Sequence, residues 1–191
     1  MQHALLTPPP PPEFAPIDYA ARRDGAHRLA AVDPARVPPE MLRQVVAYET
    51  PHPVGSIVVD TAARLLHLVL PDGYALRYGV SVGREGFGWT GEAVVYRKAT
   101  WPRWTPPPEM IERDPSLEQW RDGQPGGPSN PLGARALYLS TNGVDQGFRI
   151  HGTPHWRSIG GNASSGCFRM LQQDVIDLFE RVPVGTPVIV I

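Results

Sequence analysis

The chain has 191 residues, of which 41% are hydrophobic, enough for one domain with a real core plus an extension. Its formal net charge of −1 and its scattered arginines argue against a nucleic-acid partner. No apolar run approaches the ~18 residues that span a bilayer, so the sequence predicts no transmembrane segment. Residues 1–7 are too short for the core of a signal peptide, and no export signal is visible.

Proline dominates the first quarter of the chain. Residues 8–12 are five consecutive prolines, and more prolines recur up to position 53. Such a segment favours extended polyproline conformations and cannot join the interior of a sheet. We therefore expect residues 1–53 to form a Pro-rich N-terminal arm. Within it, apolar residues at helical spacing predict a short helix that begins at Pro38 and ends before Pro51.

From residue 54 the pattern becomes that of a β-rich domain. Apolar and β-branched runs predict strands at residues 57–59, 65–70, 74–83, 93–97, 136–140, 148–151 and 186–191. In residues 74–83 apolar side chains alternate with small or polar ones, which predicts a strand with one buried face. The Pro71-Asp72-Gly73 run predicts the turn that precedes it.

Two longer segments complete the domain. Residues 98–135 lack clear periodicity and predict a long loop, of the kind that is usually functional or disordered. Apolar residues from Leu171 to Val182 recur at helical spacing and predict a helix that packs on the sheet. Asp174 falls in its first turn, where the helix dipole favours a negative charge. We predict a mainly β fold, a sandwich of mixed sheets with one main α-helix near the C-terminus.

Cys167 is the only cysteine of the chain, so it cannot form an intramolecular disulfide. Gly166 before it permits a tight turn that can aim successive backbone N–H groups at a developing oxyanion. A free thiol has a pKa of about 8.5 and needs a nearby imidazole or helix N-terminus to form a thiolate. His151 can supply the imidazole, and the predicted helix starts a few residues after Cys167. We expect the pKa of this thiol to be lowered.

Three segments carry a resemblance to a known family: Ile150–Thr153, Ser158–Gly160 and Ser164–Met170. Together they resemble the L,D-transpeptidase catalytic domain, also called the YkuD or ErfK-type family. Further landmarks are Asn130–Gly133, the Trp101-Pro102-x-Trp104-Thr105-Pro106 loop and the opening run Ile57–Asp60. The resemblance covers about residues 54–191, which we take as the catalytic domain.

The resemblance implies a cell-wall enzyme that cuts the bond between stem residue 3 and D-Ala4 of peptidoglycan. Cys167 would be the nucleophile and His151 the general base, with the carbonyl of Gly152 orienting the imidazole. The N–H groups of Ser165, Gly166 and Cys167 would form the oxyanion hole.

Further expectations follow from the same resemblance. Arg169, Ser164 and Trp104 would contact the substrate. The partners would be donor and acceptor stem peptides, or a protein amine as acceptor, and the enzyme would be a monomer without metal or cofactor. It would act in the periplasm or cell envelope, contribute to cell shape and be a carbapenem target.

Other functions stay open at this point. Water as acceptor would make the enzyme an L,D-carboxypeptidase. His151, His155 and Cys167 are residue types that zinc accepts, although Pro154 separates the two histidines on irregular backbone. A wall-binding module without catalysis is the third alternative.

Overall fold

The computed structural model describes residues 10–13, 18–84 and 88–191. Residues 1–7, on which the prediction about a signal peptide rests, lie outside the described residues. So do Pro8 and Pro9, the first part of the proline run. Among the residues described, no helix has both the length and the apolar character needed to cross a membrane.

A mixed sheet dominates the fold. Within the described part of the chain it has nine strands in the order β12-β10-β9-β8-β13-β4-β5-β6-β3. Their bounds are β3 Gln44–Ala47, β4 Ile57–Asp60, β5 Leu65–Val69, β6 Tyr74–Gly79, β8 Gly91–Thr100, β9 Arg135–Thr141, β10 Val144–Gly152, β12 Phe168–Met170 and β13 Pro187–Val190. The β10–β12 and β13–β4 pairs are parallel and the other pairs antiparallel. The prediction of a mainly β fold with mixed sheets is confirmed.

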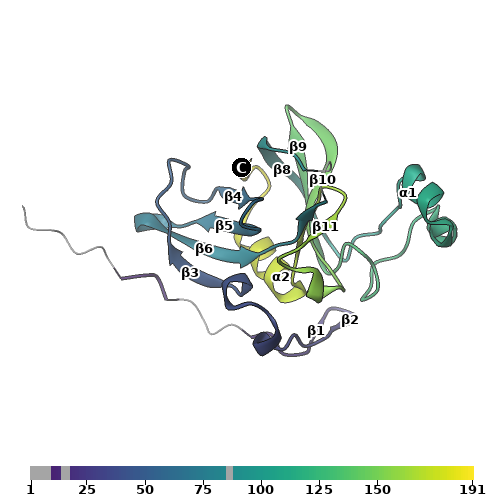
Figure 1. Ribbon diagram of the computed structural model, residues 1–191, viewed down its shortest axis with the longest axis horizontal. Coiled ribbons are helices and arrows are strands. Elements are labelled where there is room, and N and C mark those ends of the chain that lie inside the picture. Colours follow the sequence, from purple (N-terminus) through teal and green to yellow (C-terminus); the bar gives the residue numbers. More distant parts are fainter. Residues whose placement is uncertain (1–9, 14–17, 85–87) are drawn as a thin grey trace, which may run out of the picture.

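Smaller elements surround this sheet. Two-stranded sheets pair β1 (Arg22–Asp24) with β2 (His27–Leu29) and β7 (Val82–Gly83) with β11 (Asn162–Ser164). The α-helices are α1 (Pro108–Arg113) and α2 (Gln172–Arg181), and the 3-10 helices are η1 Pro34–Arg36, η2 Pro39–Met41, η3 Pro71–Gly73, η4 Pro115–Trp120 and η5 Trp156–Ser158. The predicted helix near the C-terminus is therefore α2. Residues 98–135, predicted as a loop, hold the end of β8, then α1 and η4, and α1 projects away from the body (Figure 1).

The core lies between the two halves of the large sheet and α2. In Figure 1 the strands β3 to β6 and the strands β8 to β10 form two inclined layers, with α2 beside both. Buried side chains from each layer meet there, among them Leu66 and Tyr78 from one half and Leu137 and Ile150 from the other. Leu178 of α2 closes the same cluster. This arrangement is the predicted sandwich, and it leaves the opposite face of β9, β10 and β12 free of the main core.

The helix predicted to start at Pro38 is wrong beyond its first turn. Only η2 is helical, and residues 44–47 form β3, an edge strand antiparallel to β6. Val45 and Val46 are β-branched, and pairing with β6 satisfies backbone groups that a short isolated helix would leave marginal. The large sheet thus takes one strand from the segment predicted to be an arm.

The single strand predicted at residues 74–83 is divided into β6 and β7, which belong to different sheets, and the burial of β6 differs from the prediction. Ala75 and Gly79 are buried as well as Leu76 and Tyr78, so both faces of β6 are covered. A Cβ on Gly79 would lie 2.4 Å from the carbonyl oxygen of Met41, because η2 packs directly on this strand. The N-terminal segment therefore hides a face that the alternation assigned to solvent.

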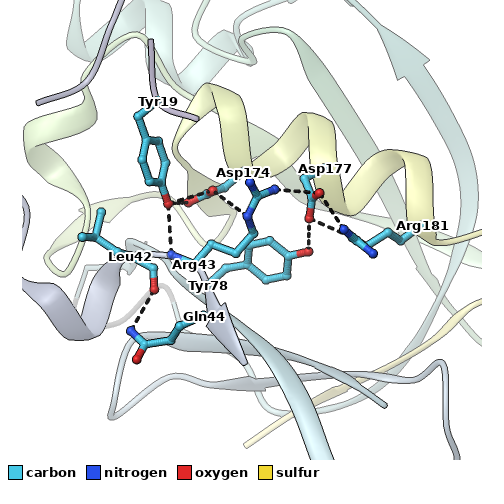
Figure 2. A network of polar contacts seen from close by, with 8 residues as sticks. All are labelled: Tyr19, Leu42, Arg43, Gln44, Tyr78, Asp174, Asp177 and Arg181. Atoms are coloured by element: carbon cyan, nitrogen blue, oxygen red, sulfur yellow. Dashed lines mark hydrogen bonds and ion pairs between the residues drawn. The ribbon is translucent and has the colours of Figure 1, made fainter. Parts of the chain in front are cut away.

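A polar cluster ties the N-terminal segment to α2, as Figure 2 shows. We call it the strap network: Tyr19, Arg43, Tyr78, Asp174, Asp177 and Arg181. The Tyr19 hydroxyl lies 3.1 and 3.2 Å from the two carboxylate oxygens of Asp174 and accepts the backbone N–H of Arg43 at 3.0 Å. Asp174 is fully buried. Its carboxylate is bound by this tyrosine, which is 155 positions away in the sequence, in addition to lying in the first turn of the helix as the sequence indicated.

The rest of the strap network is held by Asp177. Its carboxylate accepts from the Tyr78 hydroxyl at 2.7 Å and pairs with Arg43 at 2.6 Å. Arg181, one helical turn later, binds the same carboxylate at 2.8 and 2.9 Å. Asp177 thereby links α2 to β6, through Tyr78, and to the N-terminal segment, through Arg43.

Candidate active site

The parallel pairing of β10 with β12 brings the predicted nucleophile and base to neighbouring strands. His151 is in register with Arg169, and Ile150 with Phe168. Cys167 directly precedes β12, and its thiol is within reach of the backbone N–H of Arg149. Side chains of residues in register on neighbouring strands point to the same face of a sheet, and along one strand every second side chain points to that face. Ile150 and Phe168 enter the core. Arg149, His151, Cys167 and Arg169 therefore share the opposite face, which we call the catalytic face.

The turn before Cys167 has the geometry that its glycine predicted. Gly166 has φ of 111°, a backbone conformation that side chains rarely adopt. The Ser164 hydroxyl accepts from Gly166 N–H at 3.1 Å and donates to the carbonyl of Cys167 at 2.5 Å. Ser164 thus braces the turn from inside, and its predicted contact with substrate stays a prediction. The helix does not follow Cys167 directly, because β12 lies between them.

His151 is buried, and its ring is fixed by the chain itself. Nδ1 lies 2.6 Å from the carbonyl oxygen of Gly152. A carbonyl only accepts, so Nδ1 carries the proton and Nε2 keeps its lone pair. Burial, together with the charges of Arg169 and Arg149, lowers the pKa of His151 to about 4, although the carbonyls of Gly152 and Pro131 act in the opposite direction. The imidazole is therefore neutral near pH 7.

Cys167 departs from the expected low pKa. Burial raises the pKa of the thiol, and the backbone N–H of Arg149 together with the charges of Arg149 and Arg169 only partly oppose it. The sulfur lies 3.7 Å from the carbonyl oxygen of Gly147, to which the thiol can donate. The thiol of Cys167 and the imidazole of His151, both on the catalytic face, are therefore a neutral pair in the resting state. The expectation of a lowered thiol pKa is wrong because burial outweighs the nearby positive charge.

Gln172, which the sequence did not indicate, supports the His151–Gly152 backbone. Its side-chain oxygen accepts from Ala134 N–H at 2.9 Å. A Cβ on Gly152 would lie 2.2 Å from that oxygen, and one on Gly133 would lie 2.5 Å from it. Both glycines are therefore required by the close approach of the first residue of α2. Gln172 comes two residues after the Ser164–Met170 segment, and this closeness in sequence could have indicated a role for it.

A cavity of about 540 Å³ opens beside the nucleophile turn. Gly166 and Phe168, the two neighbours of Cys167, line one side of it. Arg64 and Arg84 also line it, two cations suited to an anionic ligand. The remaining lining residues are Thr61, Ala62, Val82, Gly83, Gly88, Trp89 and Asn162.

The two tryptophans of the 98–135 segment have different surroundings. Trp101 donates from Nε1 to Asp24 at 2.7 Å, and its ring centre lies 4.4 Å from that of His27 with the planes tilted by 49°, so it holds the segment to the β1–β2 hairpin. Trp104 pairs through its backbone with Gln124, at 2.6 and 2.9 Å, and is half-buried. It is not among the described residues that line the cavity beside Cys167, and its contact with substrate stays a prediction.

The residues proposed for zinc are not gathered into a site of that kind. His155 is exposed and precedes η5, whereas His151 is buried on β10. Within residues 10–13, 18–84 and 88–191, no group of three or more His, Cys, Asp or Glu side chains is placed to hold a metal ion.

Comparisons with known proteins agree with the geometry of the catalytic face. The family model of the L,D-transpeptidase catalytic domain, YkuD, matches residues 55–190. A Fuscovulum blasticum relative, named an L,D-transpeptidase in the ATP synthase subunits region, is 37% identical over 71% of this chain and 68% of its own length. ErfK/SrfK of Escherichia coli K12, also named an L,D-transpeptidase, is 35% identical over 71% of this chain. The match spans only 43% of that longer protein.

Solved structures share the fold. A Brucella melitensis crystal structure named a carnitine operon oxidoreductase is 44% identical, with a TM-score of 0.56, over 81% of this chain and 96% of that one. An Enterococcus faecium L,D-transpeptidase superposes with a TM-score of 0.55 at 17% identity, over 73% of this chain and 50% of that one. At that identity the likeness concerns the fold alone.

Proposed function

The chain belongs to the L,D-transpeptidase catalytic domain family, and we propose that it is a peptidoglycan L,D-transpeptidase in which Cys167 is the nucleophile and His151 the general base. The observation that carries the proposal is the catalytic face itself. Parallel pairing of β10 and β12 supports it, because the two side chains then belong to one face of the sheet, and the Gly152 carbonyl accepts from Nδ1, so the neutral imidazole keeps its lone pair on Nε2.

The reaction begins from the neutral pair. Nε2 of His151 takes the thiol proton as Sγ of Cys167 attacks the carbonyl carbon between stem residue 3 and D-Ala4. The proton then passes from the imidazolium to the departing nitrogen, D-Ala leaves as the amine, and a thioester remains on the sulfur. An acceptor amine attacks the thioester, gives its proton to His151, and the sulfur leaves and regains a proton from the imidazolium.

The oxyanion of each tetrahedral intermediate needs N–H donors near Cys167. Gly166 N–H already donates to Ser164, so we assign the role to the N–H groups of Ser165 and Cys167. Arg64 and Arg84, which line the cavity, suit the carboxylates of a stem peptide, and the charge of Arg169 adds to the positive charge near the sulfur. The donor and acceptor would be peptidoglycan stems, or a protein amine in the acceptor role, in the periplasm or cell envelope where this family acts.

The test is product analysis with purified muropeptides. The chain should release D-Ala and form a new amide between stem residue 3 and an acceptor amine, detected by mass spectrometry. Cys167→Ala should lose at least about a thousandfold of this activity while its melting temperature stays unchanged. A carbapenem should add one mass equivalent to the wild type and none to the variant.

Other outcomes have distinct products. Water as acceptor would give a shortened stem without a cross-link and would mark the chain as an L,D-carboxypeptidase. An oxidoreductase, the activity in the name of the Brucella structure, would leave the stem peptide bonds intact. Activity of Cys167→Ala within severalfold of the wild type would overturn the proposed mechanism.

A further inference from the structure

Arg149 is a cation on the catalytic face that the sequence reasoning did not single out. It is two residues before His151 on β10, in the position opposite Cys167. Its guanidinium forms two bonds to Asp145, at 2.7 and 2.9 Å. Bidentate pairing of this kind holds the planar guanidinium in one orientation.

Tyr138 of β9 fixes the same guanidinium from another side. The Arg149 guanidinium carbon lies 4.5 Å from the centre of the Tyr138 ring, and that of Arg97 lies 4.6 Å from it. Tyr138 is in register with both residues, which is why the three side chains stack on one face of the sheet. Cation–π contact at this distance stabilises a positive charge.

Asp145 is itself held in place. It accepts from the Tyr96 hydroxyl at 2.7 Å and from Gly147 N–H at 2.8 Å. Gly147 is also the residue whose carbonyl faces the sulfur of Cys167 at 3.7 Å. The Asp145–Arg149 pair and the nucleophile are therefore joined through one short stretch of β10.

We propose that Arg149 is a positioning residue whose fixed guanidinium stabilises the thiolate that forms when His151 takes the Cys167 proton, and that Asp145 both holds this charge and weakens its effect. The inference rests on the proposed function only for the identity of the nucleophile.

The charged groups around the sulfur agree in sign with this role. After burial, which raises the pKa of the Cys167 thiol, the opposing influences are the backbone N–H and charge of Arg149 and the charge of Arg169, whereas Asp145 raises it. His151 is neutral and adds no charge in the resting state. Positive charge beside the nucleophile must then come from the arginines, because burial withholds it from the imidazole.

The experiment compares two variants that break the same ion pair. The rate of Cys167 alkylation by iodoacetamide is measured against pH for the full chain, for Arg149→Gln and for Asp145→Asn. If the guanidinium acts by charge, Arg149→Gln moves the thiol titration to higher pH and alkylates on the order of three to ten times more slowly at pH 7. Asp145→Asn moves the titration in the opposite direction.

Controls separate charge from structure. Arg149→Lys keeps the charge without the bidentate geometry and should restore part of the alkylation rate. Arg97→Gln removes a second cation from the Tyr138 ring and should leave the titration of Cys167 unchanged.

Equal shifts in one direction for Arg149→Gln and Asp145→Asn, or no shift in either, would overturn the proposal, because the pair would then be only structural. Should Arg149→Gln fail to fold, Asp145→Asn alone decides: an unchanged or less acidic thiol rejects the proposed role. Alkylation needs no peptidoglycan, so failure of the muropeptide assay and failure of this inference are distinguishable.

Discussion

The strap network and the polar contacts of Arg149 beside the catalytic face use the same residue types, arginine, aspartate and tyrosine, but differ in solvent exposure. Asp174 in the strap network is fully buried, whereas the side chain of Asp145 beside the catalytic face is 36% exposed. Burial raises the pKa of Asp174 to about 7 despite Arg43 and Tyr19, yet hydrogen bonds from Tyr96 and Arg149 outweigh burial and hold the pKa of Asp145 low.

The difference shows that an ion pair keeps a carboxylate charged only where its hydrogen bonds and charges outweigh burial. Arg43 approaches Asp174 only to 3.9 Å, while Arg149 binds Asp145 through two short bonds. A carboxylate that is partly solvated and well paired keeps its charge and can serve chemistry. A fully buried one with a loose ion pair mainly links elements of the fold.

The largest effect on the catalytic side should come from His151. His151→Gln removes the general base while keeping a polar side chain, and we expect a loss of about 10² to 10⁴ in kcat/KM for transpeptidation. Melting temperature and titration of the thiol in the unfolded protein check that the variant folds and retains its thiol.

The pH profile sharpens the same point. The pKa of His151 is lowered from 6.5 to about 4, so the base stays unprotonated down to that pH. In the wild type kcat/KM should therefore fall on the acid side near pH 4. An acid limb centred between pH 6 and 7 would show an ordinary imidazole and contradict the neutral resting pair.

On the strap side, Asp174 should make stability depend on pH in an unusual direction. Its folded pKa is raised from 3.8 to about 7, so the folded state binds the proton more tightly than the unfolded state between those values. The free energy of unfolding from this group falls as pH rises through that window, by on the order of 4 kcal/mol at about 1.4 kcal/mol per pKa unit.

Asp174→Asn removes that titration and keeps a side chain that can bind the Tyr19 hydroxyl. Urea unfolding of both proteins at pH 4, 5.5 and 8 should show the difference between them changing in favour of the variant as pH rises. A difference that is constant with pH would mean that Asp174 titrates as an ordinary carboxyl.

Much of the fold could be predicted because its signals are local. β4, β5 and α2 follow from apolar runs and spacing within a few residues. The apolar residues around β3 have helical spacing, which predicted a helix. The segment forms a strand because it pairs with β6, about thirty positions later in the chain. The pairing of Cys167 with His151 as nucleophile and base stays a prediction, which the parallel register of β10 and β12 supports.

What sequence reasoning missed depends on distant contacts. Arg149 is an unremarkable strand residue until Tyr138 and Asp145 are placed around it. Tyr19 meets Asp174 across 155 positions, and no local pattern indicates that pairing. The direction of the Cys167 and His151 pKa shifts depends on burial, which spacing alone does not give.

The smallest effect is expected from Tyr19→Phe, which separates the two clusters most cleanly. The change removes one hydroxyl that contacts the Asp174 carboxylate and the Arg43 N–H, and keeps the buried ring. Leaving these buried groups without that partner should lower the free energy of unfolding by roughly 1 to 3 kcal/mol.

Its effect on chemistry should be absent, because Tyr19 contacts α2 and the Arg43 backbone and is not among the groups that shift the Cys167 pKa. We therefore expect the alkylation profile of Cys167 to match that of the wild type at temperatures where both proteins are folded. A shifted profile in Tyr19→Phe would show that the strap network and the catalytic face are coupled through α2, and Gln172 at the start of that helix would be the first contact to examine.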